Sequence, residues 1–218
     1  MWNIPRYLTH IVWPVVCPVC GAIGADVCEA CLESLSGMTA KFCVSCGGGY
    51  PCATHENAVS CVAFSSYRGV NRDVIHVMKY NCGRRIALMM GRVMARSIPS
   101  PEVDFLVPVP LHRNSEREYN QAEQIAEGAS RVWGIPVRNA LRWQSASERQ
   151  AGKKNTTLRT LPDDAIMPFG SELPGARVFL VDDVLTTGST MMAAIRAAEN
   201  GGARVRGSMV WSVSASKF

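Results

Sequence analysis

Two carboxylates and a run of small hydroxyl residues stand close together near the carboxyl end of the sequence. Asp182 and Asp183 follow the apolar positions 178–181, which are typical of a buried strand in a parallel sheet. The run that comes next consists of Thr186, Thr187, Gly188, Ser189 and Thr190. Acids at the end of such a strand can accept hydrogen bonds from sugar hydroxyls, and a Thr/Gly/Ser turn that opens a helix can bind a phosphate. The pattern predicts a site for a ribose 5-phosphate.

A plain Ser/Thr helix cap after a core strand is the alternative interpretation of this run, because such caps are common. A cap alone, however, requires neither the paired acids nor the whole run of small polar residues. Residues 191–199 have helical composition, so the run is expected to form the turn that opens this helix. Gly188 would allow the backbone to approach a ligand closely.

A second set of residues with ligand chemistry lies near the amino terminus. Three C-x-x-C pairs and one C-x-x-H pair are formed by Cys17, Cys20, Cys28, Cys31, Cys43, Cys46, Cys52 and His55. Each pair can place two ligands on one side of a tight turn, and together they can make two tetrahedral sites, one of four cysteines and one of three cysteines and a histidine. The spacing predicts one or two structural zinc ions.

The spacing leaves the pairing open. Sequential pairing would place residues 17–31 on one ion and residues 43–55 on the other, whereas a cross-braced pairing would mix them. A single zinc that leaves Cys52 and His55 unliganded is a further alternative, and disulfides would require an oxidising compartment. Cys61 and Cys82 lie outside any pair and are expected to be small buried side chains.

The whole chain has the composition of a globular protein. It contains 218 residues, of which 47% are hydrophobic and 19% charged, enough for one α/β domain with a small appendage. The sequence contains no apolar run of the roughly 18 to 20 residues that span a bilayer. The opening residues 1–16 include Pro5 and Arg6 and run directly into cysteines, unlike a signal peptide. We therefore expect a cytoplasmic protein without a membrane span.

Strands and helices alternate along the rest of the chain. The expected elements are a strand at 60–67, helices at 72–79 and 84–97, a strand at 105–110 with two prolines at its exit, and a helix at 120–133. This alternation predicts an α/β fold with a mostly parallel sheet flanked by helices. Residues 1–58 are expected to form a zinc-binding module resembling a double zinc ribbon, and residues 59–218 the main domain.

Residues 178–190 resemble the PRPP-binding motif of type I phosphoribosyltransferases: apolar residues, two acids, an apolar pair and then Thr-Thr-Gly-x-Thr. The resemblance implies a type I phosphoribosyltransferase-like domain that binds PRPP with Mg²⁺. It also implies that Asp182 and Asp183 contact the ribose hydroxyls and that residues 186–190 hold the 5-phosphate.

The order of motifs extends the resemblance. A cysteine-rich amino-terminal module, a Pro-Val-Pro strand exit, an Asn-Gln helix start and a carboxyl-terminal PRPP motif together resemble the ComF/GntX family of competence and DNA-utilisation proteins. Membership would imply a role in single-stranded DNA uptake, with DNA-uptake proteins as partners. Two departures stand out: Glu118 replaces a glycine of the family pattern, and the element beginning at Arg159 lacks the usual asparagine.

Cations near the exit of the strand at 105–110 would contact the pyrophosphate of PRPP. The candidates are Lys79, Arg113 and Arg117, with a solvated surface position as the alternative for each. The sequence contains no recognisable general base and no recognisable specificity loop for a base. An active phosphoribosyltransferase in nucleotide salvage, or a structural adaptor with a vestigial ligand site, are the alternative functions.

Basic residues outnumber acids in residues 68–96 and again in residues 138–159, within a chain of net charge +5. A basic groove with a stacking aromatic side chain is how single strands are held without sequence readout. The candidate contacts are Arg84, Arg85, Trp143, Lys153 and Lys154. The alternative is two solvated faces and a core tryptophan.

Overall fold

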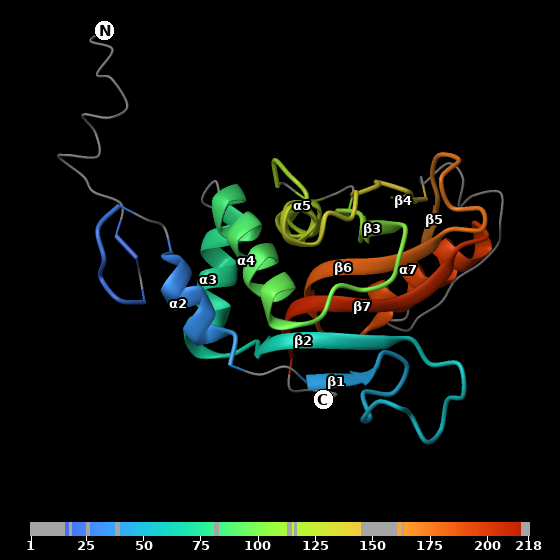
Figure 1. Cartoon of the computed structure of the whole chain (residues 1–218), viewed down its shortest axis with the longest axis horizontal. Helices are drawn as coiled ribbons and strands as arrows, with labels where there is room; N and C mark the ends of the chain where they lie inside the picture. The colour runs from blue at the N-terminus through green and yellow to red at the C-terminus, as the bar shows by residue number, and fades with distance from the viewer. Residues whose placement is uncertain are drawn as a thin grey trace, which may run out of the picture.

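A five-stranded sheet with strand order β1-β2-β7-β6-β3 forms the centre of the molecule (Figure 1). The computed structural model describes residues 16–17, 19–24, 27–37, 40–80, 83–112, 115, 117–144, 161–162 and 164–214. The strands are β1 (Ala40–Cys43), β2 (Ser60–Ser66), β3 (Phe105–Pro108), β6 (Arg177–Leu185) and β7 (Arg204–Val213). β1 is antiparallel to β2, and all other neighbours are parallel. The mostly parallel sheet predicted from the sequence is confirmed.

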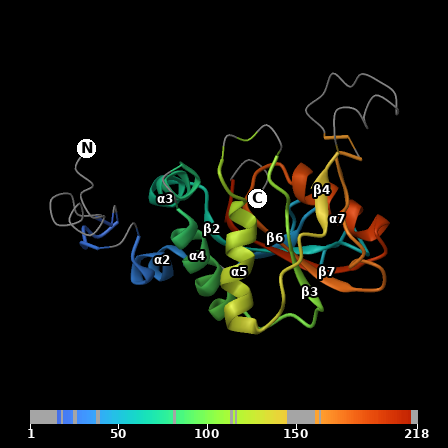
Figure 2. The ribbon, with the colours of Figure 1, turned by 90° about the horizontal axis from the view of Figure 1, so that it is seen from above.

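Helices cover both faces of this sheet (Figures 1 and 2). The helices are α2 (Glu29–Leu35), α3 (Gly69–Tyr80), α4 (Arg84–Ser97), α5 (Gln121–Trp133) and α7 (Ser189–Asn200). One core packs α2, α3, α4 and α5 against one face around Phe64 and Trp211. On the other face, α7 packs beside a small antiparallel sheet of β4 (Leu141–Trp143) and β5 (Ile166–Pro168). No helix in the described ranges combines the length and apolar character needed to cross a membrane.

Two glycines bring α4 and α5 into backbone contact. A Cβ atom at Gly91 would lie 1.9 Å from the carbonyl oxygen of Ile125, and one at Gly128 would lie 2.1 Å from that of Leu88. Such distances exclude any side chain, so both positions require glycine at this helix crossing. The close contact fixes α5 on the sheet and thereby fixes where its first residues lie.

Most predicted helices are confirmed where the sequence carries clear end signals. The helix at 84–97 coincides with α4. α5 begins after Asn120, whose Oδ1 accepts the N–H of Ala122 at 3.1 Å, and ends at Gly134 with φ of 72°. α3 starts at Gly69, earlier than the expected residue 72.

The expected end of the strand at 178–181 is wrong. β6 continues through both acids to Leu185, because β7 pairs with it over the whole length, with Asp182 opposite Val210 and Leu185 opposite Val213. The acids therefore lie within the last residues of a strand rather than after it. The sequence also did not predict the short strands β1, β4 and β5.

The main sheet contains residues from both predicted domains. β1 lies within residues 1–58, yet Ala40 pairs with Ala63 and Cys43 with Ser60 of β2. The first cysteines lie farther out, beside α2, at one end of the molecule in Figure 1. The amino-terminal region is thus joined to the main domain through a shared sheet.

Candidate functional site

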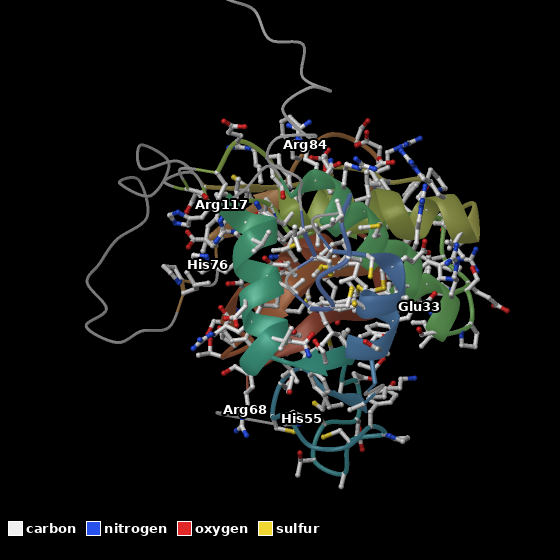
Figure 3. All side chains as sticks on the ribbon, turned by 90° about the vertical axis from the view of Figure 1, so that its left-hand side faces the viewer. Glu33, His55, Arg68, His76, Arg84 and Arg117 are labelled. Carbon is white, nitrogen blue, oxygen red and sulfur yellow. The ribbon has the colours of Figure 1, made fainter. Side chains whose placement is uncertain are left out.

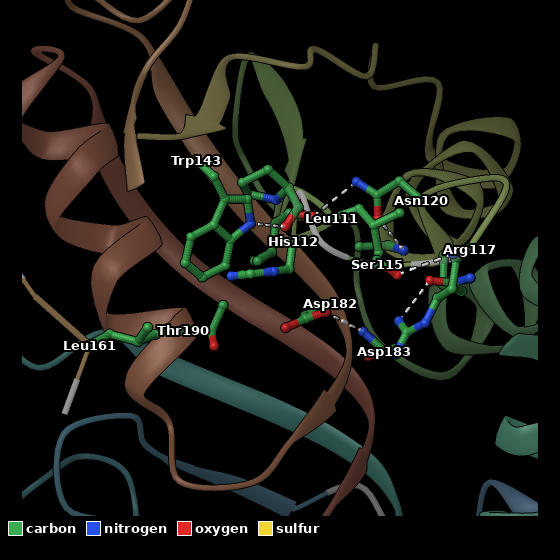
Figure 4. Close-up of a pocket in the computed structure, with 14 residues that line it drawn as sticks. Leu111, His112, Ser115, Arg117, Asn120, Trp143, Leu161, Asp182, Asp183 and Thr190 are labelled. Carbon is green, nitrogen blue, oxygen red and sulfur yellow. Dashed lines mark hydrogen bonds between the residues drawn. The ribbon is translucent and has the colours of Figure 1, made fainter. Parts of the chain in front are cut away.

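A cavity of about 600 Å³ opens at the carboxyl ends of β3 and β6 (Figure 4). Its walls come from the exit of β3, the start of α5, β4, the end of β6 and the start of α7. The lining residues are Val109, Pro110, Leu111, His112, Ser115, Arg117, Asn120, Gln121, Ala122, Trp143, Leu161, Asp182, Asp183 and Thr190. Ligands of open α/β sheets bind at this edge, so the cavity is the candidate ligand site.

The paired acids differ in their environments. Asp183 is buried, and its Oδ2 lies 2.9 Å from Nζ of Lys79 on α3. Asp182 is half-buried and lines the cavity, and its Oδ1 accepts the N–H of Asp183 at 2.8 Å. Burial, and then the charge of Asp183, raise the pKa of the Asp182 carboxyl well above its usual value. Lys79, predicted to face a pyrophosphate, instead neutralises an acid of the site.

The Thr/Gly/Ser run forms the tight turn from β6 into α7. Gly188 has φ of 78° and is the N-cap of α7, with no side-chain cap bond, which leaves the helix start suited to an anion. The hydroxyls of Thr187 and Ser189 lie 2.8 Å apart, and Thr190 lines the cavity. The predicted turn is present, but α7 starts at Ser189 rather than at residue 191.

Gly188 lies against the backbone of the loop between β1 and β2. A Cβ atom at this position would lie 3.2 Å from the carbonyl oxygen of Val44, which belongs to the loop between β1 and β2. The positive φ and this close approach together explain why glycine stands here.

The start of α5 supplies the polar wall opposite the acids. Arg117 lines the cavity, as its predicted role requires, and its Nη1 donates to Oε1 of Gln121 at 3.0 Å. Gln121 is 1% exposed, and its Nε2 has no hydrogen-bond partner among the described residues. The Asn-Gln helix start in the sequence does not by itself predict that Gln121 is buried beside the cavity. Arg113 lies outside the described residues.

An aromatic pair closes the other end of the cavity. Trp143 is 8% exposed, and its Nε1 donates to the carbonyl oxygen of Pro110 at 2.8 Å. The ring of His112 meets it edge-on, with centroids 4.7 Å apart. Trp143 therefore presents little open surface to a stacked base outside the cavity, contrary to the expectation of an open nucleic-acid groove.

Two of the four basic residues predicted to contact nucleic acid lie within the described residues. Arg84 and Arg85 are exposed at the start of α4, and the Arg84 guanidinium lies 5.2 Å from the ring centroid of Tyr119. Figure 3 shows Arg84 and Arg117 toward the same end of the molecule. Lys153 and Lys154 fall outside the described residues.

The cysteines and His55 gather into two groups, the first cluster and the second cluster. The first cluster is Cys17, Cys20, Cys28 and Cys31, and the second cluster is Cys43, Cys46, Cys52 and His55. Within each cluster all ligand atoms lie within 4.8 Å of one another, so each can hold a metal ion. The grouping is sequential, not cross-braced, and it includes Cys52 and His55.

The donor sets suit a tetrahedral ion. The sulfur atoms of Cys20 and Cys28 lie 3.6 Å apart, as do those of Cys46 and Cys52, and the described cysteines are free thiols. The clusters lie apart, as Figure 3 shows through Glu33 on α2 and His55 in the loop after β1. Cys61 belongs to neither and is fully buried, as predicted, and burial raises the pKa of its thiol to about 12. Cys82 lies outside the described residues.

Solved structures that are similar to this chain include adenine phosphoribosyltransferases and a PRPP amidotransferase. Glutamine PRPP amidotransferase from B. subtilis is 20% identical over 58% of this chain and 26% of its own, with a TM-score of 0.39. Adenine phosphoribosyltransferase from Thermoanaerobacter pseudethanolicus is 15% identical over 84% of this chain and 99% of its own, with a TM-score of 0.40. Adenine phosphoribosyl transferase from Trypanosoma brucei is 11% identical over 88% of this chain and 82% of its own, with a TM-score of 0.36.

The chain spans about a quarter of the length of the larger relatives, such as the amidotransferase. No curated protein matches the sequence. The phosphoribosyl transferase domain, in contrast, matches residues 91–217, which is more than half of the chain. The chain therefore belongs to the phosphoribosyl transferase domain family and has its type I fold, preceded by cysteine clusters that can hold metal ions.

Proposed function

We propose that this protein binds PRPP, or a related ribose 5-phosphate, with Mg²⁺ in the cavity at the end of β6. The observation that carries the proposal is that Asp182, Asp183 and Thr190 line one cavity at the β6–α7 turn of a chain from this family. The acids would accept the ribose hydroxyls. Residues 186–190 would hold the 5-phosphate at the start of α7.

The polar wall opposite the acids would receive the pyrophosphate. Arg117 is held at the cavity by Gln121, whose buried Nε2 would gain an acceptor when an anion binds. Arg113 remains a second candidate. Bound Mg²⁺ would supply additional positive charge for the pyrophosphate.

Calorimetric titration with PRPP and Mg²⁺ tests this site. The wild type should bind, and the double variant Asp182→Asn with Asp183→Asn should not. Arg204→Ala serves as a control, because this exposed residue starts β7 and does not line the cavity. No heat of binding with folded, metal-loaded wild type would refute the proposal and would favour a structural adaptor.

The finer proposal is that of a cytoplasmic ComF/GntX-like protein that assists single-stranded DNA uptake or utilisation, in contact with DNA-uptake proteins. The order of the cysteine module, the Pro-Val-Pro strand exit and the carboxyl-terminal motif supports it. Arg84 and Arg85 are exposed at the start of α4 and would contact phosphates, and Lys153 and Lys154 would add further contacts.

Salt-dependent DNA binding tests this part separately. The double variant Arg84→Ala with Arg85→Ala should make the negative slope of log K against log salt shallower. On single-stranded DNA its magnitude should fall by about 0.7 for each lost phosphate contact. Arg204→Ala with Arg206→Ala removes equal charge from β7 and should leave the slope unchanged. Equal slopes in all three proteins would refute a DNA role for the α4 arginines.

An active phosphoribosyltransferase is the second candidate function. The observation that favours it is the pair of Trp143 and His112 at the far end of the same cavity, against which a planar base could pack. Pyrophosphate release from PRPP in the presence of a panel of bases tests it. Release that is lost in the double aspartate variant would support catalysis, whereas PRPP binding without turnover would favour a binding role.

A further inference from the structure

The loop that carries the second cluster contacts the turn of residues 186–190 and the start of α7. Its loop follows β1, and the carbonyl oxygen of Val44 sits against Gly188, where a Cβ atom would be only 3.2 Å away. The hydroxyl of the next residue, Ser45, donates to Sδ of Met192 in the first turn of α7 at 3.7 Å. Two residues of the cysteine loop thus touch the turn and the helix start that would hold the phosphate.

These two contact residues are enclosed by metal-ligand candidates. Val44 and Ser45 lie between Cys43 and Cys46 in a tight turn, in which the N–H of Gly47 donates to the carbonyl oxygen of Cys43 at 2.8 Å. Val44 is buried in the same core as the start of α7, and its N–H donates to the carbonyl oxygen of Val59 at 3.1 Å. An ion bound by Cys43 and Cys46 would therefore fix the conformation of the segment on which Gly188 rests.

The positions of the other two ligands, Cys52 and His55, depend on the ion more strongly than those of Cys43 and Cys46. Cys52 and His55 are supplied by an exposed loop, and their Sγ and Nδ1 atoms lie 3.3 Å apart. A metal would connect this loop to Cys43 at the end of β1 and so close the whole segment from 43 to 55 around one point. Loss of the ion would release that restraint.

The first cluster has a different neighbour. It surrounds the start of α2, and α2 is held to α4 by the ion pair between Arg96 and Glu29 at 2.5 Å. Its described contacts therefore lead to the helices of the opposite face of the sheet from α7. Removal of a ligand from the first cluster is therefore a control for removal of a ligand from the second cluster.

We propose that the second cluster positions the phosphate-binding turn, so that metal occupancy at this cluster sets the affinity for the ribose phosphate. This inference rests on the proposed function. Because the two binding events are coupled, PRPP must also raise the metal affinity of the second cluster by the same factor. A factor on the order of tenfold is typical of such couplings.

Matched ligand variants provide the first test. Cys52→Ala removes a ligand of the second cluster and Cys20→Ala removes one of the first, and each should cost one metal ion per chain. Calorimetry with PRPP and Mg²⁺ should show affinity weakened on the order of tenfold in Cys52→Ala and nearly unchanged in Cys20→Ala. Circular dichroism checks that each variant is folded.

A measurement on the unaltered protein keeps the proposal testable if a variant fails to fold. The wild type is titrated with a zinc-selective chelator in excess Mg²⁺, with and without PRPP, while the methyl resonance of Met192 is followed by NMR. We expect PRPP to protect one of the two metal ions, and the Met192 resonance to shift when that ion leaves.

The outcomes separate the two proposals. Wild type that fails to bind PRPP overturns the proposed function and, with it, this coupling. Wild type that binds PRPP, but with equal affinity in Cys52→Ala and equal metal retention with and without the ligand, overturns the coupling alone.

Discussion

The ammonium group of Lys79 lies 2.9 Å from Oδ2 of Asp183 and joins α3 to the end of β6. Both side chains are largely buried, at 15% and 11% exposure, so the pair is weakly screened by water. Asp182 stands beside it, and the charge of Lys79 opposes the rise in the pKa of that carboxyl. Lys79 therefore forms an ion pair with one of the two neighbouring acids and offsets part of the charge repulsion between them.

Replacing Lys79 by methionine should destabilise the protein by about 3 kcal/mol, because a buried carboxylate loses its partner. Arg72→Met on the same helix is the control. Its ion pair with Asp73 is 63% and 64% exposed, so its loss should change stability by less than about 1 kcal/mol. Urea unfolding followed by circular dichroism measures both. Similar losses in the two variants would contradict the buried pair.

The stability of the protein should depend on pH through Asp182. Its pKa is higher in the folded than in the unfolded state, so between the two values the folded state binds more protons. This contribution is favourable below the unfolded pKa, near 4, and is lost as the pH rises through the folded pKa. Asp182→Asn should therefore gain stability relative to wild type as the pH rises. Parallel unfolding curves from pH 4 to 8 would contradict the assignment.

Metal should be part of the fold. Purified wild type should contain two zinc ions per chain, one for each cluster, and Cys17→Ser should lower metal content and solubility together. Cys61→Ala is a suitable control, since this fully buried cysteine belongs to neither cluster and its replacement should leave the metal content unchanged. Elemental analysis measures the ratio, and less than one zinc ion per wild-type chain would refute a structural metal.

The crossing of α4 and α5 should not tolerate a methyl group. Gly128→Ala would place Cβ 2.1 Å from the backbone oxygen of Leu88, which should cost about 3 kcal/mol as the helices are forced apart. Gly37→Ala is the control, because its Cβ would meet no atom closer than 3.9 Å. Thermal unfolding should show a clearly lower Tm for Gly128→Ala alone.

The features that the sequence predicted well are those encoded by neighbouring residues. Asn120 and Gly134 mark the ends of α5, and the C-x-x-C and C-x-x-H pairs mark the residues of both clusters that can hold metal ions. The two acids and the Thr/Gly/Ser run also point to the turn at the cavity. In each case the physical signal lies within a few residues of the chain.

The features that the sequence did not predict depend on distant partners. β6 extends past Asp183 because β7 supplies hydrogen bonds, and Trp143 lies in the cavity wall because Pro110 accepts its N–H. The contact of Val44 with Gly188 joins segments far apart in the chain. None of these relationships leaves a periodic pattern in the residues themselves.

The position of β1 at the edge of the sheet bears on aggregation of the protein. Along its length, from Ala40 to Cys43, it occupies one edge of β2. A shortened protein beginning at residue 59 would expose that edge as a row of unpaired N–H and C=O groups, which is the template for strand-to-strand aggregation. β1 thus covers this edge of β2 and keeps those backbone groups paired within the chain.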